Sequence, residues 1–138
     1  MKTDDHLLLG KYLLNIKKIK LSPLKEKWFL IGCVEPDYNP FTYIRGSIKH
    51  KLLHGHNALN CKKHIGRIVE KLSCTTISTP YQWFLLGTAV HYIADCFTFA
   101  HNEFFTGGMA QHMKYEMLLQ PIFHNFVIGL KEPQNKYK

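Results

Sequence analysis

The chain has 138 residues, of which 46% are hydrophobic, and it carries a formal net charge of +8. Because this length suits one domain and this apolar fraction suffices for a core, we expect residues 1–138 to form a single domain. The positive charge favours anionic partners, namely phosphate esters, anionic membrane surfaces or nucleic acid, without choosing among them. No apolar run approaches the roughly 20 residues of a membrane span, so no membrane-spanning helix is expected.

The first residues do not resemble a secretory signal. Two acids follow Lys2, and no cleavage site made of small residues comes after them. We therefore expect a cytoplasmic protein that can also lie at the periphery of a membrane. The four cysteines form no C-x-x-C pair and are expected to be reduced, inert thiols; they are Cys33, Cys61, Cys74 and Cys96.

The first half of the chain predicts two helices followed by an irregular stretch. Apolar residues recur at helical spacing over 6–20, and lysines end this segment. Pro23 opens a second apolar segment, which predicts a short helix with proline in its first turn. Residues 35–55 contain the run E-P-D-Y-N-P-F, whose two prolines and asparagine are typical of a loop.

The second half predicts three further helices. Helical spacing returns over 56–73, and residues 74–79 form a connector in which Ser78 or Thr79 caps the next helix. That helix, from Pro80 to about Phe99, is the most apolar and should be central. Gly107 and Gly108 separate it from a last helix over 109–130. The predicted fold is therefore all-α, a single-domain bundle of about five helices with a metal site in a cleft between them.

Histidines and carboxylates recur at a spacing that places them on one helix face. His91 and Asp95 are four residues apart in the most apolar helix, and His112 and Glu116 repeat the spacing in the last helix. A buried carboxylate without a partner costs several kcal/mol, roughly, and a metal ion is an economical partner. His101 lies between the two pairs. Imidazole nitrogen and carboxylate oxygen both suit zinc, so the pattern predicts a metal cluster.

These residues resemble those of a known family. The segment H91-Y-I-A-D95-C-F-T-F-A-H101 is similar to the H-x-x-x-D-x-x-x-x-x-H core of the bacterial zinc-dependent phospholipases C, and H112-M-K-Y-E116 resembles the later H-x-x-x-E. The single-strand-specific fungal nucleases are more distant relatives. D37-Y-N-P resembles an earlier Asp-Tyr-x-x-Pro loop, His56 the histidine that follows it, and His6 the first metal-binding histidine. The resemblance spans residues 6–116.

The resemblance implies two or three zinc ions, with these ligands carried over by motif. Asp37, His56, His91 and Asp95 would hold one ion, and His101, His112 and Glu116 a second. Asp95 would bridge the first ion to a third, which His6 would also bind. Family members bind that third ion through the main chain of an N-terminal tryptophan, and the main chain of Met1 would replace it here. His54, two residues before His56, remains the alternative ligand.

The implied function is hydrolysis of a phosphodiester in a phospholipid head group or a small phosphate ester. A metal-activated water would attack phosphorus, and Asp37 would orient or deprotonate that water as the catalytic residue. Glu116 favours this interpretation over a nuclease, which usually has aspartate there, so nucleic acid is the less favoured partner. The alternatives are a single-strand nuclease and a non-catalytic metal-binding or membrane-surface module. The aromatic residues at 38–43 and 97–105 either line a lipid-accepting opening or belong to the core.

Overall fold

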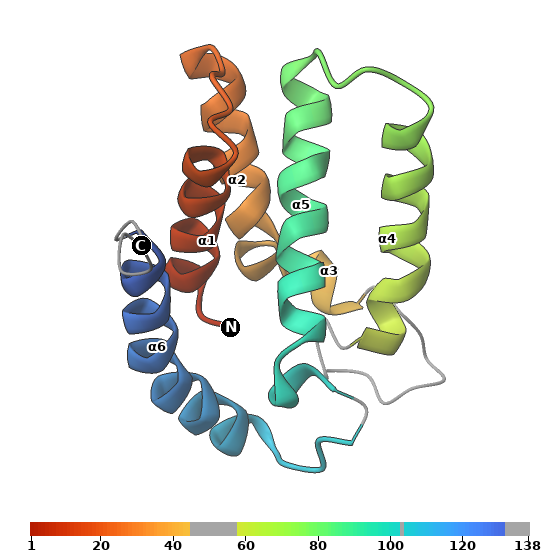
Figure 1. The fold of residues 1–138 in the computed structure, drawn as a ribbon. Helices are drawn as coiled ribbons and strands as arrows, with labels where there is room; N and C mark the ends of the chain where they lie inside the picture. The colour runs from red at the N-terminus through yellow and green to blue at the C-terminus, as the bar shows by residue number, and fades with distance from the viewer. Residues whose placement is uncertain (45–57, 103, 132–138) are drawn as a thin grey trace.

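The computed structural model describes residues 1–44, 58–102 and 104–131, and all regular elements within these residues are helical (Figure 1). The prediction of an all-α fold is confirmed, with six α-helices in the described residues where about five were predicted. The elements are α1 (Thr3–Ile16), α2 (Pro23–Tyr38), α3 (Pro40–Ile44), α4 (Ala58–Ser73), α5 (Pro80–Cys96), the short 3₁₀ turn η1 (Phe99–His101) and α6 (Met109–Lys131). Among the described helices, none is long and apolar enough to cross a membrane.

The start of α5 follows the prediction. Thr79 is the N-cap, its side chain accepts a hydrogen bond from the Gln82 main chain, and Pro80 occupies the first turn. Gln82 reaches back to the Thr79 main chain, which completes a capping box. The helix ends at Cys96 rather than near Phe99 as predicted, and His101 lies in η1.

The stretch 35–55 was predicted to be irregular, and its described part is helical instead. The second helix is longer than expected because α2 continues to Tyr38, and α3 follows at Pro40. A proline inside a helix removes one main-chain hydrogen bond, which is why Pro36 indicated a loop. Packing of α2 along α5 stabilises the last turn of α2 in spite of this loss. Asp37 consequently projects from a helix and not from a loop.

The most extensive helix pair is α2 with α5, and two glycines bring their main chains together. A Cβ atom added to Gly32 would lie 2.1 Å from the Phe84 carbonyl oxygen, and one added to Gly87 would lie 2.1 Å from the Phe29 carbonyl oxygen. Side chains larger than hydrogen therefore do not fit at either position. This contact aligns the half of α2 that carries Asp37 with the half of α5 that carries the predicted ligands.

The core lies on both sides of α5. On one side Leu14, Phe29, Cys33 and Trp83 pack together between α1, α2 and α5. On the other side Ile68 and Leu72 of α4 pack against Ala89 of α5. Burial also raises the pKa of the Cys33 and Cys61 thiols to about 12, so these two cysteines are inert core residues as predicted. The central position predicted for α5 is confirmed.

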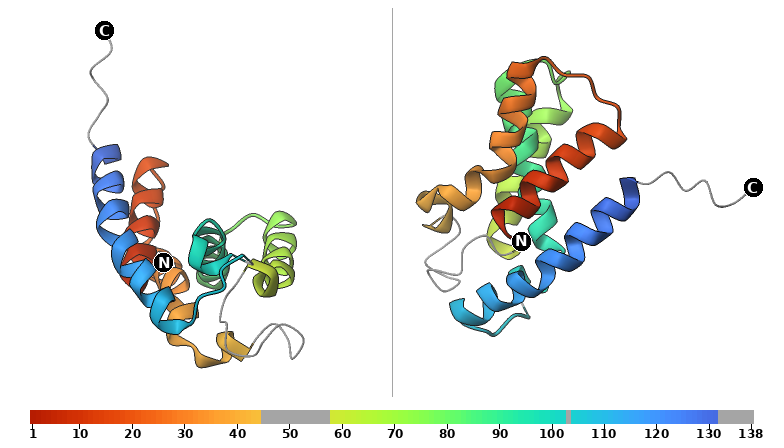
Figure 2. Two further views of the ribbon diagram at one scale, coloured as in Figure 1. Left: turned by 90° about the horizontal axis from the view of Figure 1, so that it is seen from below. Right: turned by 90° about the vertical axis from the view of Figure 1, so that its left-hand side faces the viewer.

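Helix α6 lies beside α1, as the different views show (Figures 1 and 2). Polar side chains join the two helices: Gln120 accepts a hydrogen bond from Lys2 Nζ at 3.0 Å, and His124 Nε2 lies 2.9 Å from Asp5 Oδ1. Asp5 is fully buried. These contacts hold the N-terminal end of the chain against α6.

Candidate metal centre

The carboxylate of Asp95 lies at the centre of the candidate site. Its Oδ1 atom is 2.6 Å from the Met1 amine and 3.1 Å from His6 Nε2. Its Oδ2 atom is 3.3 Å from His91 Nε2 and 3.5 Å from His101 Nε2. The two oxygens thus face two different sets of nitrogen atoms. A carboxylate in this position has the geometry to bridge two ions.

Two groups of side chains have ligand atoms that converge within 4.8 Å of one another. The first consists of His6 from α1 with His91 and Asp95 from α5, all three buried. The second consists of His101 from η1, which is buried, with His112 and Glu116 from α6, which are half-buried. His112 Nε2 lies 3.0 Å from Glu116 Oε1, as the spacing of four residues predicts.

Neighbouring groups fix the orientation of two imidazole rings. His91 Nδ1 is 2.8 Å from the Cys33 carbonyl oxygen, which can only accept, so Nδ1 carries the proton. The Thr98 hydroxyl donates its proton to the main-chain carbonyl oxygen of Asp95, so it accepts a hydrogen bond from His101 Nδ1 at 2.8 Å. In the neutral form of each ring, Nε2 therefore directs its lone pair at the cluster. Such outer partners are typical of histidines that bind metals.

Asp37 lies at the edge of the first group. Its Oδ2 atom accepts a hydrogen bond from the Thr3 hydroxyl at 2.8 Å, and its Oδ1 atom is 3.5 Å from His91 Nε2. The side chain is 17% exposed, whereas those of His91 and Asp95 are at most 1% exposed. Asp37 therefore connects the buried cluster with solvent.

The Met1 amine joins the two groups. Besides its contact with Asp95, it lies 3.0 Å from Glu116 Oε1, and its side chain is buried. Burial by itself lowers the pKa of this amine, but the charges of Asp95 and Glu116 outweigh burial and raise it. The amine thus occupies the position between the two groups where a cation is stabilised.

Burial and neighbouring charges shift the pKa values in the cluster. Burial lowers the pKa of His6, and it lowers that of His101 to about 3. Burial alone would raise the pKa of Asp95, but its contacts with His6 and His91 hold it well below its usual range. Burial likewise opposes the shift at Glu116, where His112 and the Met1 amine lower the pKa to about 2. Neutral imidazoles and ionised carboxylates are the forms that bind metal ions.

The residues fit a bound zinc ion. Both ring nitrogens of His6 and Oδ2 of Asp95 are buried, and within the described chain they make no well-formed hydrogen bond. Buried polar atoms of this kind are rare in native proteins and call for an ion or water. Zinc accepts imidazole nitrogen and carboxylate oxygen, so these donors match its preference.

The structure brings together eight of the nine predicted ligand residues: Met1, His6, Asp37, His91, Asp95, His101, His112 and Glu116. His56, its alternative His54 and their loop lie outside the described residues. Thr3, Thr98 and the Cys33 carbonyl were not predicted. Only Thr98 had a local signal, since it follows Asp95 by three residues; the other two depend on helix packing.

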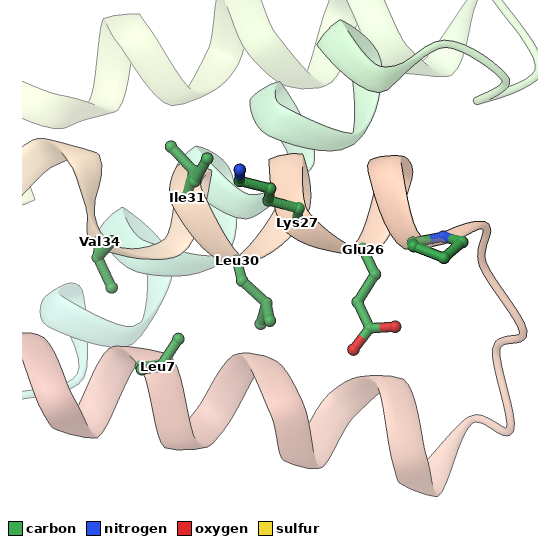
Figure 3. Close-up of a pocket in the computed structure, with 7 residues that line it drawn as sticks. Leu7, Glu26, Lys27, Leu30, Ile31 and Val34 are labelled. Atoms are coloured by element: carbon green, nitrogen blue, oxygen red, sulfur yellow. The ribbon is translucent and has the colours of Figure 1, made fainter.

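A separate pocket of about 480 Å³ lies between α1 and α2 (Figure 3). It is lined by Leu7, Pro23, Glu26, Lys27, Leu30, Ile31 and Val34. None of these residues belongs to the candidate metal centre. The convergence of donor atoms around Asp95, and not this mostly apolar pocket, therefore identifies the chemical site.

The all-helical fold and the two adjoining His/carboxylate groups are typical of a helical protein that depends on metal ions. The sequence profile described as zinc dependent phospholipase C matches residues 5–138, and the chain belongs to this family. At the level of the family this makes it a zinc-dependent hydrolase that acts on phospholipids. No curated protein and no solved structure matches the chain.

Proposed function

We propose that residues 1–138 form a single domain that hydrolyses the phosphodiester of a phospholipid head group or a smaller phosphate ester. The observation that carries this proposal is the Asp95 carboxylate, whose two oxygens face different sets of metal-binding groups. Zinc bound at these groups would activate water and neutralise the charge that develops on the phosphate. Two or three ions are expected, and we propose cytoplasmic and membrane-peripheral locations.

Each residue has a proposed role. His6, His91 and Asp95 would hold one ion, and His101, His112 and Glu116 would hold another. The Met1 amine completes the set between them, and His56 is a further candidate ligand outside the described residues. Asp95 contributes most because it belongs to the first group and also faces His101 of the second at 3.5 Å.

Asp37 is the proposed catalytic residue, in addition to touching the metal. The Thr3 hydroxyl holds its Oδ2 atom, which leaves Oδ1 directed at the cluster. From this position the carboxylate orients a water and accepts its proton. The water oxygen then bonds to phosphorus while the bond from phosphorus to the leaving alcohol oxygen breaks. That oxygen takes up a proton, and the products are an alcohol and a phosphate monoester.

The test combines metal analysis with hydrolysis assays on one preparation. Two or three zinc ions per chain, with chelator-sensitive hydrolysis of phosphatidylcholine or a simple phosphodiester, would support the proposal. Zinc without hydrolysis would favour the non-catalytic module, and cleavage of single-stranded DNA alone would favour the nuclease. A chain that binds no zinc would refute the assignment.

A matched pair of variants tests the role of Asp37. Asp37→Asn should reduce kcat by about 10²- to 10⁴-fold, since removing a general base has this effect. Asp4→Asn makes the same chemical change at an exposed position of α1 and should leave kcat unchanged. Equal activity of the two variants would contradict the proposed role of Asp37.

A further inference from the structure

Large apolar side chains are exposed at positions close in sequence to the candidate ligands. Phe97 is 87% exposed and follows Asp95 by two residues, while Phe104 is 71% exposed and follows His101 by three. Single exposed apolar residues are ordinary on protein surfaces, but a group of them around one site indicates an interaction surface.

The same arrangement recurs at the ligands that reach solvent. Met113 follows His112, Met117 follows Glu116, and both methionines are more than half exposed. Phe41, 70% exposed, follows Asp37 by four residues and belongs to α3. We call these five side chains the apolar rim; they are Phe41, Phe97, Phe104, Met113 and Met117. The segment around η1 and the first half of α6, which carry four of these side chains, lie at the lower end of the bundle in Figure 1, and α3, which carries Phe41, follows the end of α2.

Two contacts hold the segment around η1 against α6. The Tyr115 hydroxyl accepts a hydrogen bond from the Phe99 main chain at 3.2 Å, and the Phe105 ring packs edge-on against His112 with centroids 6.0 Å apart. The Phe99 and Phe105 rings pack edge-on against each other, although Phe99 is itself 53% exposed. The exposed rim residues are left to contact something outside the bundle.

The charges near the rim favour a lipid surface over a second copy of the chain. Among the described residues of 38–44 and 97–118, Lys114 is exposed and no carboxylate is, since Glu116 is turned to the Met1 amine. Two copies that each carry a net charge of +8 repel each other. A bilayer with anionic lipid instead attracts the charge and accepts apolar side chains.

We propose that the apolar rim inserts into the surface of a phospholipid bilayer and so places the metal centre at the head groups. This proposal rests on the proposed function only in taking a phospholipid surface as the occupant. Asp37, His112 and Glu116 are the partly exposed ligands, and each lies within four residues of a rim side chain, so the segments that open the cluster to solvent are the segments that carry the rim.

Co-sedimentation with vesicles tests the rim. The probe is vesicles of phosphatidylcholine with phosphatidylglycerol, and the full-length zinc-loaded chain is expected to bind them. Phe97→Ser and Phe104→Ser should each weaken binding about tenfold, because each removes the burial of a large apolar side chain. Tyr81→Ser is the matched control, since Tyr81 is 53% exposed and lies in the first turn of α5 at the opposite end.

Equal binding of all three variants would overturn the proposal, as would a wild-type chain that stays in solution. Thermal unfolding by circular dichroism checks that each variant folds, as expected for substitutions at exposed positions. Released head group, measured in the same samples, separates the two proposals. Vesicle binding without hydrolysis counts against the proposed function alone, whereas hydrolysis of dissolved short-chain lipid without vesicle binding counts against the rim alone.

The fluorescence of a tryptophan placed in the apolar rim tests whether lipid covers the rim. In Phe97→Trp the added tryptophan should emit as an exposed side chain in buffer, and vesicles should shift its emission to the blue. Brominated lipid should quench it, while Phe104→Ser should reduce the quenching. Blue emission without vesicles would show that the chain itself or a second copy covers the rim, and would overturn the proposal.

Discussion

The glycine contact between α2 and α5 yields a prediction about both stability and metal binding. Gly87 lies where α5 meets the main chain of α2, and a Cβ atom there would be 2.1 Å from the Phe29 carbonyl oxygen and 2.9 Å from the Cys33 nitrogen. Ordinary contacts begin at 3.4 Å. Gly87→Ala must therefore push the two helices apart by about 1.3 Å, since main-chain atoms cannot rotate away.

The magnitude follows from two opposing effects. Overpacking of this kind costs about 3 kcal/mol. Alanine is the better helix former and returns about 1 kcal/mol. The net loss in the free energy of unfolding is then about 2 kcal/mol. At this chain length 1 kcal/mol corresponds to roughly 3–5 °C in Tm, so we expect a decrease of roughly 6–10 °C.

Gly66 provides the matched control. It lies in α4, and a Cβ atom added there meets no other atom within 4 Å. Gly66→Ala should therefore raise the free energy of unfolding by up to about 1 kcal/mol. Thermal and urea unfolding of the two variants, both prepared without metal, measure the contrast. A Gly87→Ala protein as stable as Gly66→Ala would refute the close helix contact.

The same substitution should weaken zinc binding. Moving α2 away from α5 stretches the hydrogen bond between His91 and the Cys33 carbonyl and withdraws Asp37 from His91. Titration with zinc, followed by calorimetry on protein shown by circular dichroism to be folded, should give a weaker first site in Gly87→Ala. Zinc affinity equal to that of Gly66→Ala would show that the α2–α5 spacing does not set the site.

Three further predictions concern the cluster and its support. Asp95→Asn should lose more zinc than any other single substitution, because Asp95 contacts histidines of both groups. Metal analysis of the purified variant would disprove this by finding full zinc content. Without metal, the free energy of unfolding should fall by up to a few kcal/mol as the pH falls from 6.5 to 3, because buried His101, with a pKa of about 3, stays neutral while the unfolded chain binds a proton. The raised pKa of His91 acts in the opposite direction. A free energy of unfolding that does not change with pH, measured in urea, would contradict this prediction. His124→Ala should lower the free energy of unfolding in urea by about 1–3 kcal/mol, because it removes the partner of the buried Asp5 carboxylate. The control Asn125→Ala, at an exposed neighbouring position, should cost nothing. Equal losses in the two variants would count against the contact between His124 and Asp5.

Local patterns were sufficient to predict the helices and half of the site. Capping residues and proline marked the start of α5 because these signals act within a few residues. The pairs His91/Asp95 and His112/Glu116 could be recognised for the same reason, since a spacing of four residues sets neighbours on a helix face. The family resemblance added the more distant ligands by motif alone.

Long-range packing decided how these residues meet. The contact of His6 with Asp95 depends on α1 lying against α5, and that of the Met1 amine with Glu116 depends on α6 lying beside α1. Pro36 indicated a loop because its cost is local, while the packing that outweighs this cost comes from α5, far away in the sequence. Spacing within a helix is set by covalent geometry, whereas the approach of helices is set by which surfaces fit together, and a single sequence does not display that fit.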